Sequence, residues 1–136
     1  VPNLVKNPVF LYMSDGFKKP APFDPSIVIP IDDVFDTKVD AIWTLESQIE
    51  STWETGAFEK IVPIPKEGPE RQMRFEKLKS RMQRRDGGVA NRFREKLIEL
   101  YVEDAGKKIT YAEAFEVCEY GRQPSIQELK TMFPAE

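Results

Sequence analysis

Residues 27–43 read IVIPIDDVFDTKVDAIW, a strand-like run that leads directly into a helix-like run. The β-branched residues at its start favour a buried strand, although Pro30 has no backbone N–H and suits the edge of a sheet. Asp32 and Asp33 follow where a helix N-terminus favours carboxylates. The stretch therefore predicts a strand followed by a helix over about 34–52.

The predicted helix carries apolar residues at spacings that keep them on one side. They are Val39, Ile42, Trp43 and Ile49, with Trp53 directly after the expected end. An apolar stripe of this kind is buried by packing, here against the predicted sheet. A strand that leads into such a helix indicates an α/β fold.

The remaining elements are expected from local patterns. An apolar run at 8–13 predicts a buried strand, whereas the prolines of 18–25 predict a loop. Weak alternation over 109–118 is compatible with a further strand. Ser125 and Glu128 have the spacing of a capping box, which predicts a short final helix.

The segment 66–96 differs from its surroundings in charge. It holds eleven basic and five acidic residues, a net charge of +6, whereas the rest of the chain carries −9. Apolar periodicity predicts helices at 70–85 and 89–104, which the Gly87–Gly88 pair is expected to separate. The sequence thus predicts a basic helical hairpin at 66–104, inserted in or attached to the α/β body.

The composition excludes several classes of function. The chain has 136 residues, no histidine and one cysteine, Cys118, so it cannot form an internal disulfide or a cysteine zinc cluster. Histidine-dependent chemistry must come from outside this sequence. No apolar run reaches the roughly 20 residues of a membrane-spanning helix, and we expect a cytoplasmic protein. Val1 in place of methionine suggests a processed product or an excised piece.

Three segments keep a common order along the chain. They read NPVFLYMSD at 7–15, IDDVFDTKVDA at 31–41 leading to Glu46-Ser47-Gln48, and YAEAFE at 111–116 continuing as CEYGRQP at 118–124. Together they resemble the C-terminal part of the PIG-L/LmbE-like family of metal-dependent N-deacetylases.

The resemblance implies a partial Rossmann-like three-layer domain covering 1–136. Such proteins hydrolyse the acetamide of N-acetylglucosamine-type substrates with zinc, which is held by an HPDDE-type motif and a later HxxH-type segment. This chain contains neither motif, and Leu45 stands where the family usually has a histidine. It therefore has no catalytic residue, metal ligand or cofactor of its own. Zinc is expected in the full-length relative.

Four residues are candidates for binding a sugar-type substrate. Asp15 follows a predicted strand and would orient a hydroxyl, or it is a turn aspartate that bonds its own backbone. Tyr111 and Glu113 lie in the segment most like the family, where Glu113 borders a pocket or faces solvent. Arg122 would hold an anionic group, or it is simply solvated. Asp32, Asp33 and Asp36 resemble a metal cluster but suit a helix start better.

The first hypothesis is the C-terminal portion of a zinc-dependent N-deacetylase, whose partners are the N-terminal portion of the same domain and a sugar substrate. A catalytically dead relative is the second reading, so enzyme activity stays uncertain. The alternative is a non-catalytic binding or assembly module that holds an acidic partner through the basic hairpin. Nucleic acid is not the expected partner, because the hairpin lacks interleaved aromatic residues. The sequence leaves the oligomeric state open.

Overall fold

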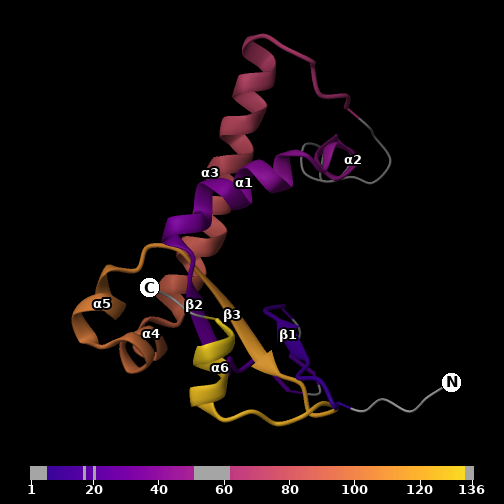
Figure 1. The fold of residues 1–136 in the computed structure, drawn as a ribbon. Helices are drawn as coiled ribbons and strands as arrows, with labels where there is room; N and C mark the ends of the chain where they lie inside the picture. The colour runs from indigo at the N-terminus through magenta and orange to yellow at the C-terminus, as the bar shows by residue number, and fades with distance from the viewer. Residues whose placement is uncertain (1–5, 17, 20, 51–61, 134–136) are drawn as a thin grey trace, which may run out of the picture.

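A three-stranded antiparallel sheet with helices around it forms the described part of the protein (Figure 1). The computed structural model describes residues 6–16, 18–19, 21–50 and 62–133. The elements are β1 (Leu11–Met13), β2 (Ile27–Pro30), a 3₁₀ turn (Asp32–Val34), α1 (Phe35–Trp43), α2 (Glu46–Gln48), α3 (Pro69–Arg92), α4 (Arg94–Tyr101), α5 (Glu103–Lys108), β3 (Ala112–Val117) and α6 (Ile126–Met132). The α/β class expected from the sequence is confirmed.

The strand order is β1-β3-β2, so the central strand is the last in sequence. β2 occupies an edge, as Pro30 predicted, and Pro30 faces Ala112 of β3. Both neighbours pair antiparallel with β3. The Rossmann-like three-layer arrangement is not confirmed. The interpretation of Asp15 as a crevice residue at the carboxyl end of a parallel strand therefore loses its structural basis.

The strand predicted at 8–13 is shorter than expected and is not buried. β1 covers Leu11–Met13, and Tyr12 and Met13 are 43% and 66% exposed. β1 is an edge strand that pairs with β3 alone. An apolar run is buried only where other elements cover it, and Figure 1 shows β1 on the side of the sheet away from α4, α5 and α6.

The helix predicted over 34–52 is interrupted. α1 ends at Trp43, where the Thr44 hydroxyl donates to the carbonyl oxygen of Ala41 (2.7 Å) and competes with the helical hydrogen bonds. The apolar stripe packs against α3 rather than the sheet, because Val39 and Ile49 share a core cluster with residues of α3. The part of the prediction beyond residue 50, including Trp53, lies outside the described residues.

The predicted break at Gly87–Gly88 is wrong, because α3 continues through both glycines to Arg92. A Cβ on Gly87 would lie 3.6 Å from the carbonyl oxygen of Thr110, so the helix passes close to the start of β3 there. Two glycines cost roughly 2 kcal/mol of helix propensity, which packing of the buried face outweighs. Instead of a two-helix hairpin, one long helix is followed by α4 and α5, which pack chiefly on each other.

Two apolar clusters form the core. The first joins the sheet to α4 and α6 through buried residues such as Ile27, Leu97 and Leu129. The second joins α1 to α3 through buried residues such as Phe35, Val39 and Met82. α6 begins at the predicted capping box, with both reciprocal hydrogen bonds present. In the described part of the chain, no helix has both the length and the apolar character needed to cross a membrane.

Candidate functional site

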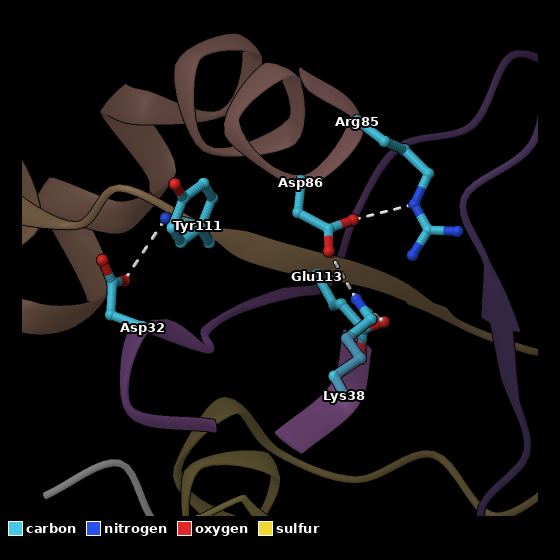
Figure 2. A network of polar contacts seen from close by, with 6 residues as sticks. All are labelled: Asp32, Lys38, Arg85, Asp86, Tyr111 and Glu113. Carbon is cyan, nitrogen blue, oxygen red and sulfur yellow. Dashed lines mark hydrogen bonds and ion pairs between the residues drawn. The ribbon is translucent and has the colours of Figure 1, made fainter. Parts of the chain in front are cut away.

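Four charged side chains from α1, α3 and β3 meet where α3 packs on β3 (Figure 2). The Lys38 ammonium lies 2.8 Å from Oδ2 of Asp86 and 2.7 Å from Oε1 of Glu113. Nε of Arg85 lies 2.8 Å from the other oxygen of Asp86. Lys38 thus bridges two carboxylates from two different elements, and the four charges sum to zero.

Asp86 is the buried member of this network, with 1% of its surface exposed. A buried carboxylate is tolerated when its charge is compensated and its oxygens are hydrogen-bonded. Lys38 and Arg85 satisfy one oxygen each. The network therefore joins α1 to α3 through an interaction whose removal leaves a charge in the interior.

Strand alternation presents Glu113 to this network. Ala112 and Ala114 are buried in the core cluster shared with α4 and α6. Because side chains alternate along a strand, Glu113 points to the opposite face, where α1 and α3 lie. Its side chain is 30% exposed. The carboxylate can therefore hold Lys38 and still reach a ligand.

A cavity of about 150 Å³ adjoins the network. It is lined by Met13, Ser14, Arg85, Asp86, Val89, Ala112, Glu113, Ala114 and Phe115. The polar lining consists of a hydroxyl, a guanidinium and two carboxylates. This combination can exchange hydrogen bonds with the hydroxyl groups of a sugar.

Tyr111 lies away from this cavity, beside Asp32 (Figure 2). Its ring stacks on Phe35 with 4.0 Å between the ring centroids. It lines a separate groove of about 680 Å³ on the other side of α3. The structure therefore does not bring Tyr111 and Glu113 into one pocket, although only one residue separates them in sequence.

Asp32 has a different role from the one expected. Its carboxylate accepts hydrogen bonds from the backbone N–H groups of Thr110 (2.9 Å) and Tyr111 (3.3 Å). It makes no capping hydrogen bond to its own helical turn. Asp36 pairs with Lys79 of α3 at 2.8 Å. These acidic residues connect the start of the helix to β3 and α3.

Asp15 and Arg122 lie outside the Glu113 cavity. Asp15 is exposed, although its neighbour Ser14 lines the cavity. Arg122 pairs with Glu128 at 2.7 Å. The backbone N–H of Ser125, together with Arg122, lowers the pKa of Glu128. The observed contacts of Arg122 therefore support the start of α6.

Sequence patterns did not identify Lys38 and Asp86 as members of a site. A signal for Asp86 was present, because Leu78, Met82, Asp86 and Ala90 recur every four residues along α3 and all four are buried. An acidic residue within an apolar stripe requires a cation from another element. The sequence contains no local indication that Lys38 supplies it.

The donor set of the described residues does not fit the zinc that the resemblance implies. Among residues 6–16, 18–19, 21–50 and 62–133, no group of three or more His, Cys, Asp or Glu side chains is arranged to hold a metal ion. Cys118 is buried. A zinc site would therefore require ligands from another polypeptide segment.

Known proteins provide no independent assignment of the site. Comparisons with family models, curated proteins and solved structures found no match.

Proposed function

We propose that the chain is the C-terminal portion of a zinc-dependent N-deacetylase that acts on an N-acetylglucosamine-type sugar. One observation carries the proposal: the first and third family-like segments, far apart in sequence, line one polar cavity, and the second segment pairs with a carboxylate of its wall. Ser14 of the first segment and Glu113 of the third line the cavity, and Lys38 of the second lies 2.7 Å from the Glu113 carboxylate. Segments retained for folding alone have no need to converge on a recess with polar walls.

In this proposal the chain binds the sugar and does not perform the chemical step. Hydrolysis of the acetamide consumes one water, breaks the C–N bond and releases acetate and an amine. The Glu113 carboxylate accepts hydrogen bonds from sugar hydroxyls, while Lys38 and Asp86 fix its position. The N-terminal portion supplies the zinc site and completes a Rossmann-like three-layer domain in the cytoplasm.

The test is deacetylation of an N-acetylglucosamine-type substrate by the full-length protein that carries Glu113→Gln. Loss of a charge-assisted hydrogen bond to the sugar predicts a decrease in kcat/KM of roughly tenfold to a hundredfold. The matched control is Glu116→Gln on the same strand, which lines no part of the cavity described here. Tyr111→Phe tests whether the substrate extends to the separate groove.

Two results would contradict the proposed function. Wild-type kcat/KM in Glu113→Gln would remove Glu113 from the substrate site. Absence of deacetylation by the unmodified full-length protein would favour the catalytically dead relative instead.

A second candidate is the binding module, and a specific observation favours it. A cavity of about 540 Å³ beside α3 is lined by Ile49, Leu78 and five basic residues, Arg74, Lys77, Arg81, Arg84 and Arg85. Arg74 and Arg85 are held by Glu70 and Asp86. On this hypothesis, Arg81→Glu abolishes binding of a polyglutamate peptide and Glu113→Gln leaves it unchanged, as measured by fluorescence anisotropy.

A further inference from the structure

The groove that Tyr111 lines is a distinct feature of the molecule, with its own chemistry. It has a volume of about 680 Å³ and lies between α3, the end of α5 and the residues that lead into β3. Four basic residues line it: Arg84, Arg94, Lys107 and Lys108. Among the described residues that line this basic groove, none is acidic. The concave surface therefore carries concentrated positive charge.

The four cations differ in their partners. The Lys107 ammonium pairs with Glu103 of the same helix. Within the described part of the chain, the side chains of Arg84 and Lys108 have no hydrogen-bond or ion-pair partner. Arg84 comes from α3 and Lys108 ends α5. The two free cations thus approach the groove from different elements.

Arg94 hydrogen-bonds backbone carbonyl groups beside the groove, which reduces their repulsion of an anion. Its Nη1 donates to the carbonyl oxygens of Gly106 (2.7 Å) and Ile109 (2.7 Å), and its Nη2 donates to Oδ1 of Asn91 (3.1 Å). Carbonyl groups at the end of a helix carry partial negative charge and would repel an anion. The guanidinium covers these carbonyl groups and is held rigidly by them.

The rest of the lining suits a hydrophilic ligand. Gln83 and Asn91 contribute amides, and Ser80 and Thr110 contribute hydroxyls. The nearby Asp32 carboxylate is occupied by the backbone N–H groups of Thr110 and Tyr111. A phosphate ester presents three acceptor oxygens and up to two negative charges, which match two free cations and several neutral donors.

We propose that the basic groove binds the phosphate group of a small hydrophilic phosphate ester. The inference does not depend on the deacetylase proposal, because it uses neither the Glu113 cavity nor a zinc site. The groove volume lies within the range of small-molecule sites.

The test is a titration of the 136-residue chain with glucose 6-phosphate, followed by NMR chemical shifts and calorimetry. Inorganic phosphate and glucose are titrated in parallel. We expect saturable binding of glucose 6-phosphate and of phosphate, no binding of glucose, and shift changes at Asn91, Lys108 and Thr110. Tighter binding of the ester than of phosphate would show that the amides and hydroxyls contact its sugar.

Substitutions locate the site. Arg84→Gln and Lys108→Gln are each expected to weaken binding roughly tenfold without loss of fold, because both side chains are exposed. Lys77→Gln and Arg81→Gln remove the same charge from α3 outside the basic groove, and they should change affinity less than about twofold.

Three outcomes would overturn the proposal. The first is absence of saturable binding at millimolar ligand. The second is equal weakening in the Lys77 and Arg81 controls, which would indicate diffuse attraction to a basic helix. The third is binding of glucose as tight as that of its phosphate.

Discussion

Replacing Lys38 by methionine tests the charged network most directly, because it removes the ammonium that Asp86 and Glu113 share. Asp86 is 1% exposed and would keep only Arg85, whose own side chain is half exposed. Breaking a buried ion pair from one side costs roughly 3–5 kcal/mol of unfolding free energy. Because Arg85 still compensates one oxygen, we expect about 3 kcal/mol.

Urea denaturation followed by circular dichroism measures this loss. With a slope of roughly 1–3 kcal/mol per molar urea, the midpoint should fall by about 1–3 M at unchanged slope. The control is Lys79→Met, which removes an ion pair to the exposed Asp36 and should cost less than about 1 kcal/mol.

The double variant Lys38→Met/Asp86→Leu separates buried charge from general packing. Replacing both buried partners by apolar residues is often neutral, so the double variant should recover most of the stability that Lys38→Met loses. A Lys38→Met midpoint that matches the Lys79→Met control would refute the reasoning. A double variant whose unfolding free energy falls by the sum of two large single-variant losses would also refute the reasoning.

Four further predictions concern stability. Trp43→Ala should lower the unfolding free energy by about 2–3 kcal/mol, because the half-buried indole packs edge-on against Phe75 with 5.5 Å between ring centroids. Gly88→Ala should raise the unfolding free energy by about 0.5–1 kcal/mol, because a Cβ at this position meets nothing within 4 Å. Gly106→Ala should lower the unfolding free energy by about 1–3 kcal/mol, because its Cβ would lie 2.6 Å from the α4 backbone. Chemical denaturation checks all three variants. Because the pKa of Glu128 is lowered in the folded state, its ionised carboxylate stabilises the fold fully above the ordinary glutamate pKa and loses this effect as the pH falls through the lowered pKa. The Tm difference between wild type and Glu128→Gln should therefore shrink as the pH is lowered below the ordinary glutamate pKa.

Local patterns were sufficient where neighbouring residues decide the conformation. The run at 27–31 predicted β2 and its edge position, because Pro30 lacks a donor wherever the strand lies. The spacing of Ser125 and Glu128 predicted the start of α6, because each of the two side chains bonds to the other residue's backbone. Each prediction depends on residues that are adjacent in the chain.

The candidate site required the tertiary structure. Glu113 was identified from its segment, but its partner Lys38 lies on α1, and Asp86 is 48 residues further along the chain than Lys38. Tyr111 and Glu113 were expected to share a pocket, and α3 separates the cavities that they line. No sequence spacing reports where a helix crosses a strand.

The sequence by itself therefore determined the α/β class, the edge strand, the capping box and the concentration of charge on the basic segment. The tertiary structure alone decided that α3 continues through Gly87–Gly88, that Asp86 is buried, and that the α1 stripe faces α3. The physical reason is one of magnitude. A glycine costs about 1 kcal/mol of helix propensity, whereas each large apolar side chain buried between α1, α3 and the sheet contributes roughly 1.5–3 kcal/mol.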